Sequence, residues 1–451
     1  MGSSPRNTHQ MAGASQVNEF YLDNVMVVAE DRLIEASEDI YSTSGMKLVA
    51  KGNKIEGRIR ERLLEHTLTK PLEDCLAVAD GVTAAHCIAV AERLLARHPV
   101  LRALCGQDPD GPLAVLAQAS FGGRLQTLMT VYNEHRAGKI DHAMCVALIA
   151  MSLLHRLPDH DQHSLAVMLV AGLAHDVGEL YINPSYLDGS HRLSTQEWRH
   201  IMTHPVIAHD LLKDLSGLAP EAAALIADHH ERLDGFGYPV GHKQPPPDVP
   251  AQILGVAEML AGLLDKGHSF LQHASVATKL IHGEFSRPVI DVVSKAYHDC
   301  QVEDEALMDA QGLEETLQTS KAVAERMHQV MEVQATVAAL VQKASPAFRQ
   351  LWAQALERFE RIKRAWSSTG LDVQPDGSWL LQESPAMQRE VAIVLMEVRW
   401  RLRELDREMR SRVSIKAPGE LPLLERYLQE VQRRVGEVVL PPEPPVATAA
   451  P

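Results

Sequence analysis

Three histidine-containing motifs lie between residues 174 and 239, and they constrain the chemistry of this chain more than any other feature. They read AHDVGEL, MTHP and DHHERLDGFGYP. Among the side chains in them that can bind a metal are His175, Asp176, His204, His229 and His230. Imidazole and carboxylate together suit first-row divalent metals such as Fe, Mn, Co or Zn. Because this stretch contains no cysteine, a thiolate-bound centre is not indicated.

At these motifs the sequence resembles the HD-GYP phosphohydrolases, a branch of the HD superfamily. The resemblance covers roughly residues 135 to 300. An HD pair, a His-Pro, an HHExxDGxGYP loop and a later acidic helix follow one another in the family's order. It implies hydrolysis of the bacterial second messenger cyclic di-GMP at a centre of two or three metal ions.

The resemblance also implies which residues bind the metals. His175 and Asp176 would be the catalytic pair. Adjacent helical residues point about 100° apart, so His175 could bind one ion while Asp176, which has two carboxylate oxygens, could bridge two. On spacing alone, His142 could equally face solvent at a helix start; the downstream motifs favour a ligand. Glu258 stands where the family usually has Asp. The implied metal ligands are His142, His175, Asp176, His204, His229, His230 and Glu258.

The segment from Asp234 to Pro239 is expected to form a loop, since two glycines and a proline permit tight non-helical backbone. In the family this loop approaches the substrate. Asp234, Gly237, Tyr238 and Pro239 are therefore implied to bind it. A simple turn with a buried tyrosine would explain the loop, but it would not explain the HHE sequence before it.

Three positions depart from the family pattern. Glu179 stands where a Lys is usual, Gln252 where an Arg is usual, and Gly138 where members with three metals have Glu. The last change favours a centre with two metal ions rather than three; the expected ions are divalent, Fe or Mn. The first two keep an alternative open: a degenerate domain that binds a cyclic dinucleotide and acts as a signalling adaptor. A third reading keeps the chemistry but changes the substrate to another nucleotide or phosphoester.

The composition predicts a mainly α fold. The chain is 45% hydrophobic but only 4% aromatic, and its 451 residues suffice for several domains. We expect an HD-type helical bundle with a small N-terminal α+β module and a C-terminal helical module. The expected divisions are a disordered tail (1–17), the α+β module (18–76), the metal-binding helical domain (77–300), the C-terminal module (301–440) and a second disordered tail (441–451).

The patterns at the two ends are less regular. Near the N-terminus, VMVV (25–28), LIEA, IYS and MKLVA resemble short strands, and residues 54–66 a helix. In the C-terminal part, LDVQPDGSWLLQ resembles a hairpin turning at Asp376-Gly377. A heptad seam too short for a free coiled coil favours an intramolecular bundle over a dimer. Its residues are Val391, Leu395, Val398, Leu402 and Leu405.

Charge and cysteine usage limit the partners. A net charge of −15 argues against binding to a nucleic acid polymer or an anionic membrane, so bound metal ions would have to attract an anionic substrate. Five scattered cysteines indicate reduced thiols in a cytoplasmic protein. Membrane insertion is not expected, because no apolar run reaches the roughly 18 residues that a membrane-spanning helix needs. Cyclic di-GMP or a related nucleotide is the expected ligand. A signalling protein, or a second copy bound through the C-terminal helices, is a possible partner.

Overall fold

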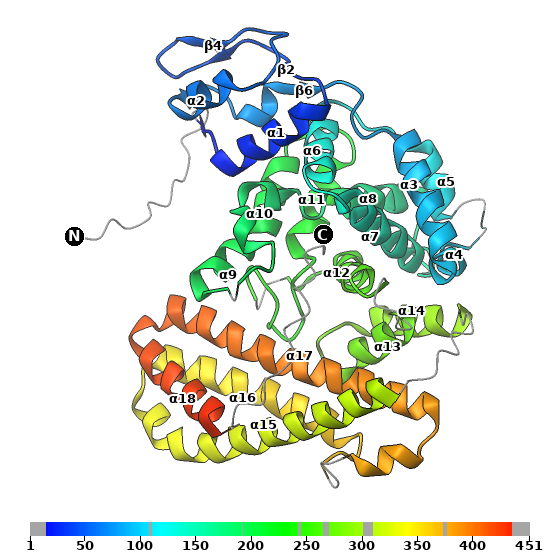
Figure 1. Ribbon diagram of the computed structural model, residues 1–451, viewed down its shortest axis with the longest axis vertical. Coiled ribbons are helices and arrows are strands. Elements are labelled where there is room, and N and C mark those ends of the chain that lie inside the picture. The colour runs from blue at the N-terminus through cyan, green and yellow to red at the C-terminus, as the bar shows by residue number, and fades with distance from the viewer. Residues whose placement is uncertain are drawn as a thin grey trace.

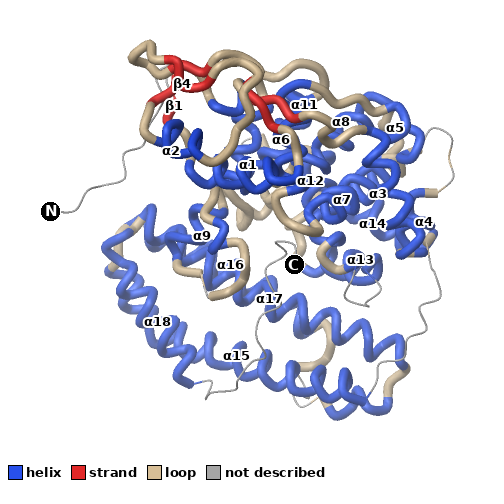
Figure 2. Tube along the Cα trace, turned by 45° about the horizontal axis from the view of Figure 1, so that its top comes forward, coloured by secondary structure: helices blue, strands red, loops and turns tan. Residues whose placement is uncertain are grey.

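The computed structural model describes residues 15–106, 108, 111–191, 193–241, 245–264, 270–300, 310–372 and 377–434. It is mainly helical with a few short strands, which confirms the expected fold class. In Figure 1 the N-terminal module lies at the top, a cluster of helices in the middle, and long C-terminal helices at the bottom. Figure 2 shows the strands confined to the N-terminal module.

The N-terminal module consists of short antiparallel strand pairs and two helices. Strand β1 pairs with β5, β2 with β6, and β3 with β4. The elements are β1 Ser15–Gln16, α1 Glu19–Asp31, β2 Ile34–Ala36, β3 Ile40–Tyr41, β4 Lys47–Val49, α2 Arg58–Leu64, β5 Thr67–Leu68, η1 Leu72–Asp74 and β6 Leu76–Val78.

Two expectations for this module are wrong. The run at 25–28 is part of helix α1, because the Asn18 side chain caps the helix by accepting from the Tyr21 N–H, and Val25 and Val28 bury one helix face. Residues 15 and 16 belong to strand β1, so the predicted disordered tail extends too far. Residues 1–14 lie outside the described residues.

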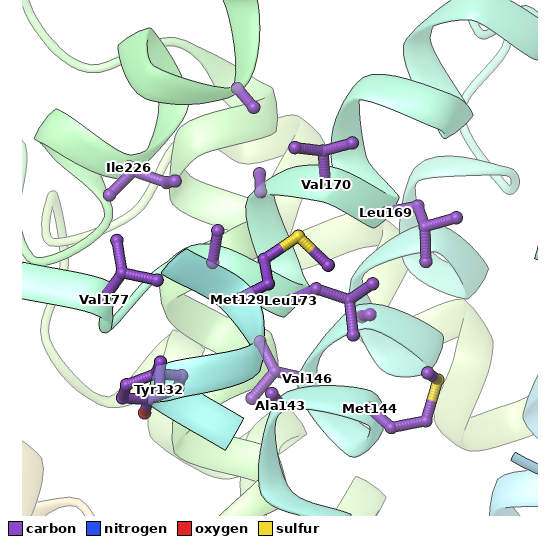
Figure 3. Packing of buried hydrophobic residues seen from close by; sticks show 14 of the residues in the cluster. Met129, Tyr132, Ala143, Met144, Val146, Leu169, Val170, Leu173, Val177 and Ile226 are labelled. Atoms are coloured by element: carbon purple, nitrogen blue, oxygen red, sulfur yellow. The ribbon is translucent and has the colours of Figure 1, made fainter. Parts of the chain in front are cut away.

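The central helices surround α7 and α8, which are among the most apolar helices of the chain. A Cβ at Gly172 would lie 2.5 Å from the Ala147 Cα, so glycine lets these two helices touch. Figure 3 shows side chains such as Met144 and Leu173 in the core around them. The elements are α3 Ala84–Arg97, α4 Pro99–Cys105, α5 Pro112–Gln118, α6 Gly123–Glu134, α7 Lys139–Leu154, α8 Gln162–Ala174, η2 Val177–Tyr181, η3 Pro184–Tyr186, α9 Thr195–Ile201, α10 His204–Leu212, α11 Ala219–Asp228, α12 Val249–Ala261, α13 Phe270–Leu280 and α14 Arg287–Asp299.

One continuous cluster of buried apolar side chains extends from the N-terminal module through α14. The five cysteines are free and buried, as expected for reduced thiols in a core. By length and composition the stretch Gln162–Tyr181 could cross a membrane, and so could the bent pair α6–α7 if it counts as one span. However, 83% of the apolar window in Gln162–Tyr181 is buried inside the fold, and the core helix of a soluble protein meets the same criterion.

A second apolar cluster is built mainly from the four helices of the C-terminal module, and it also includes Phe236 and Ile281 from the central part of the chain. The five seam residues on α17 are all buried in this cluster, so the expectation that the stripe is buried within the chain is confirmed. The predicted hairpin is wrong where it can be seen, because Ser378–Gln382 forms the 3-10 turn η5; residues 373–376 lie outside the described part. The other elements are α15 Ala310–Lys343, α16 Pro346–Ser367, α17 Pro385–Lys416, η6 Pro418–Glu420 and α18 Leu421–Arg434.

A buried ionic network joins α17 to the central helices. Arg401 pairs with Glu397 on its own helix and with Glu284, whose Oε2 is 3.0 Å from Nη2. The same guanidinium donates to the Ala277 carbonyl at 3.0 Å, and His273 Nε2 lies 2.5 Å from Glu397 Oε1. The two modules are therefore connected through desolvated charges as well as apolar contacts.

This network predicts a loss of stability in acid. Burial raises the pKa of the Glu397 carboxyl, but Arg401 and His273 outweigh it and lower the pKa from 4.5 to about 2. A depressed carboxyl pKa stabilises the folded state above the unfolded-state value, so this contribution should disappear as pH falls from about 4.5 to about 2. The free energy of unfolding, measured by urea denaturation at several pH values across this range, should depend less steeply on pH in Glu397→Gln than in the wild type. The exposed Glu357, paired with Arg361, is the matched control, since Glu357→Gln should keep the wild-type slope.

Candidate metal centre

His175 and Asp176 lie where helix α8 ends. The helix begins with a capping box in which Asp161 accepts from the Ser164 N–H, and His175 is its C-cap. The turn that follows approaches α10 closely, because a Cβ at Gly178 would lie 2.1 Å from the His204 carbonyl oxygen. Only glycine at this position allows the two segments that carry these candidate ligands to come together.

The other histidines lie at further helix ends. Helix α9 begins with the predicted capping box at Ser194, and His204 is the first residue of α10, just before Pro205. His229 is the C-cap of α11, and His230 follows it. Helix ends from different parts of the chain thus present imidazoles to one point.

The structure brings the predicted ligands into two groups that share one carboxylate. Asp176 Oδ2 lies 3.2 Å from His175 Nε2, and Asp176 Oδ1 lies 3.2 Å from His204 Nε2. Within each group the possible ligand atoms all lie within 4.8 Å of one another. The first group is His142, His175 and Asp176, and the second is Asp176, His204, His229 and His230.

Backbone carbonyls orient three of these rings. Each Nδ1 lies 2.6 to 2.8 Å from the carbonyl oxygen three residues earlier: His175 with Gly172, His204 with Ile201, and His229 with Ile226. Because a carbonyl oxygen only accepts, each Nδ1 carries the proton, and a neutral ring then has its lone pair on Nε2. Two such lone pairs, on His204 and His229, face each other at 3.4 Å, an arrangement that a cation between them would stabilise.

Several atoms at the centre are buried without a hydrogen-bond partner among the described residues. They are His142 Nε2, His175 Nε2, Asp176 Oδ1 and Glu258 Oε2. Unsatisfied buried polar atoms are costly, so their convergence indicates a missing partner. The donor set and its geometry therefore fit divalent metal ions.

Electrostatics around Asp176 favour cation binding. Burial would raise the pKa of the Asp176 carboxyl. His175, followed by His204 and Lys139, outweighs this effect and holds the pKa well below its usual range. Burial lowers the pKa of His175, yet Asp176 outweighs it and raises the value to about 9. Burial lowers the pKa of His142 to about 3 and holds those of His229 and His230 well below their usual range. A metal ion bound by His175 would displace its proton.

Glu258 lies beside both groups rather than in either of them. Its Oε2 is 3.4 Å from His230 Nε2 and 3.6 Å from His229 Nε2. Burial raises the pKa of this carboxyl to about 8. The side chains of His230 and Glu258 retain some exposure, 15% and 11%, whereas those of His175 and His229 have none. The side of His230 and Glu258 is therefore the more solvent-accessible side of the centre.

A second buried network supports Asp176 from behind, and the sequence did not reveal it. The Tyr132 hydroxyl donates to Asp176 Oδ2 at 3.3 Å, and Lys139 Nζ donates to the Tyr132 hydroxyl at 3.4 Å. Lys139 also forms an ion pair of 2.6 Å with Glu179, one of the positions that depart from the family pattern. The only sequence hint was a lysine directly after Gly138.

The loop after His230 is held by a residue of the HHE sequence. Glu231 accepts from the backbone N–H of Val240 at 2.7 Å and of Gly241 at 3.0 Å, just after Pro239. Tyr238 stacks on the His230 ring, with centroids 4.4 Å apart. The loop therefore forms one wall of the centre. The motif contained Glu231, but its role became visible only in the fold.

Asp234 points away from the histidines. Its carboxylate pairs with Arg358 of α16, and both side chains are 1% exposed. Arg358 also pairs with Glu404 at 2.9 Å, and its guanidinium lies over the Phe236 ring at 4.6 Å. Arg412 of α17 donates to the carbonyl of Gly235 at 2.5 Å. The C-terminal module thus holds this loop directly.

Gly237 is also in contact with the C-terminal module. Its carbonyl accepts from Arg412 at 3.3 Å, and a Cβ at this position would lie 2.3 Å from the Arg232 backbone nitrogen. Of the four residues implied to bind substrate, Tyr238 lies against the histidines, while Asp234 and Gly237 contact the C-terminal module.

Comparison with known proteins agrees with these observations. Residues 117–284 match the model of a family described as HD domain. The chain is 26% identical over 187 residues to a 3'3'-cGAMP-specific phosphodiesterase 3 of Vibrio cholerae, covering 40% of each chain. It is 33% identical over 104 residues to the cyclic di-GMP phosphodiesterase response regulator RpfG of Xanthomonas campestris pv. campestris, covering 23% of this chain and 28% of that protein. Each match spans less than half of the relative's length.

A solved structure, of an HDG"Y"P protein from Bdellovibrio bacteriovorus, covers 58% of this chain and 95% of its own. The identity is 14% and the TM-score 0.31.

Proposed function

The chain contains an HD domain of the HD-GYP type, and from this premise we propose that it is a metal-dependent phosphodiesterase that hydrolyses cyclic di-GMP. The observation that carries the proposal is the pair of ligand groups that share Asp176. The relatives support the reaction class, since their names describe phosphodiesterases of cyclic di-GMP and 3'3'-cGAMP. A cytoplasmic location belongs to the same proposal.

The roles of the residues follow from the geometry. His142, His175 and Asp176 would hold one divalent ion, Fe or Mn, and Asp176 with His204, His229 and His230 the other. When bound, such ions supply a water of lowered pKa and positive charge for the phosphoryl oxygens.

The chain itself holds these groups in place. Backbone carbonyls fix the imidazole orientations, and the Tyr132 hydroxyl donates to Asp176. Tyr238 would position the nucleotide from the loop, at the side of the centre where His230 retains exposure.

The decisive experiment combines metal analysis with turnover. Protein purified without chelator should contain about two Fe or Mn ions per chain and should convert cyclic di-GMP to its linear dinucleotide. Comparison with 3'3'-cGAMP and other phosphoesters as substrates would test the specificity. Absence of bound metal, together with no turnover after Mn or Fe is added, would refute the proposal.

The second candidate is a domain that binds a cyclic dinucleotide without turnover and acts as a signalling adaptor. It is favoured because the two side chains that depart from the family pattern, Glu179 and Gln252, are both used in contacts within the chain. Glu179 pairs with Lys139, and Gln252 donates to the Pro247 carbonyl while accepting from the Ser286 N–H. Tight binding of cyclic di-GMP with no product over hours would establish this function instead.

A further inference from the structure

The guanidinium of Arg407 on α17 lies over the indole ring of Trp198, 3.8 Å from its centroid. Trp198 meets Tyr238 edge to face at 5.7 Å between centroids, and Tyr238 stacks on His230 at 4.4 Å. A continuous series of ring contacts therefore connects Arg407 to a metal-binding histidine. We propose that Arg407 is a substrate-binding residue, contributed by the C-terminal module, that contacts a phosphate of the nucleotide. This inference rests on the proposed function.

Arg407 differs from the buried arginines around it in having unused donors. Arg358, Arg401 and Arg412 each pair with a carboxylate. Among the described residues, Arg407 makes neither a hydrogen bond nor an ion pair, and its Nε is buried without an acceptor. A guanidinium that lies over an aromatic ring and has unpaired N–H groups is suited to bind phosphate.

The cations nearer to the centre are already committed to other partners. Lys139 is paired with Glu179 in the interior. Arg232 donates to the backbone carbonyls of His229 and Glu231, at 3.3 and 3.0 Å. Because the whole chain has a net charge of −15, an anionic nucleotide needs local positive charge in addition to the metal ions. Arg407 places such a charge beside the loop.

The arrangement of α17 strengthens this assignment. Arg399, Arg403 and Arg407 follow one another at four-residue spacing, so they share one helix face. No ion pair is recorded for these three in the described residues. Burial lowers the pKa of Arg399, and the charge of Arg403 lowers it further. Like charges at this spacing destabilise a helix, so an anion bound at Arg407 would relieve its repulsion with Arg403, one turn away, without involving Arg399.

The test is steady-state hydrolysis of cyclic di-GMP by the full chain with Mn. Arg407→Ala should raise KM about 10- to 100-fold, the loss expected for a hydrogen bond to a charged group. Its kcat and metal content should remain wild type, and Arg407→Lys should recover part of the affinity because it keeps the charge but loses the planar fork. Arg399→Ala is the matched control, because Arg399 lies about 12 Å farther along the same helix face and should leave KM unchanged.

An unchanged KM in Arg407→Ala, or equal increases in Arg407→Ala and Arg399→Ala, would overturn this inference while leaving the phosphodiesterase proposal intact. If the wild-type protein binds cyclic di-GMP without turnover, the same comparison of variants on Kd decides the question. If it neither binds nor hydrolyses cyclic di-GMP or 3'3'-cGAMP, both proposals fail. Circular dichroism of each variant excludes unfolding as the cause.

Discussion

Replacement of Asp176 by Asn should remove bound metal and reduce turnover by at least about 1,000-fold. Asp176 belongs to both ligand groups, and each of its oxygens lies 3.2 Å from a different histidine. Asparagine keeps the shape but loses the negative charge. Metal ions supply several kcal/mol of transition-state stabilisation, and about 1.4 kcal/mol corresponds to a tenfold change in rate. Elemental analysis and an assay of cyclic di-GMP hydrolysis would measure both effects.

His200→Ala is the matched control for this prediction. His200 is an exposed imidazole on α9, one turn before His204, and it belongs to neither ligand group. Its removal should leave metal content and turnover close to wild type. If Asp176→Asn retained two metal ions per chain, the assignment of Asp176 as the shared ligand would be wrong.

Replacement of Arg358 by Met should destabilise the protein by about 3 to 5 kcal/mol, the usual effect of removing one partner from a buried ion pair. The change leaves the buried carboxylate of Asp234 without its cation. Glu284, which is only 3% exposed, also loses its ion pair with Arg358. The loop that forms one wall of the metal centre would lose its main anchor to α16. Chemical denaturation monitored by circular dichroism measures the free energy of unfolding.

Two further variants show whether the buried charge is the cause. Arg361→Met removes an arginine one turn away that pairs with the exposed Glu357, so it should change stability by less than about 1 kcal/mol. Adding Asp234→Asn to Arg358→Met should restore part of the loss, because an amide tolerates burial better than an unpaired carboxylate. Equal destabilisation by Arg358→Met and Arg361→Met would contradict this account.

The sequence alone was sufficient to predict the parts of this protein that depend on local patterns. The histidines lie next to helix ends because helix-terminating and capping residues accompany them, as at Ser194 and Pro205. The apolar seam on α17 was predictable because its spacing places every member on one helix face. The same kind of argument failed at residues 25–28, where β-branched residues favour strands in general but pack here as one face of α1.

The tertiary structure alone decided how distant residues meet. Glu179 pairs with Lys139 across 40 positions, and Arg358 with Asp234 across 124. No periodicity or spacing encodes such pairs, because their energy comes from charges that are desolvated only once the helices have packed. The sequence therefore determined which side chains could bind metal, whereas packing of the C-terminal helices determined how the loop beside that centre is held and placed Arg407 next to it.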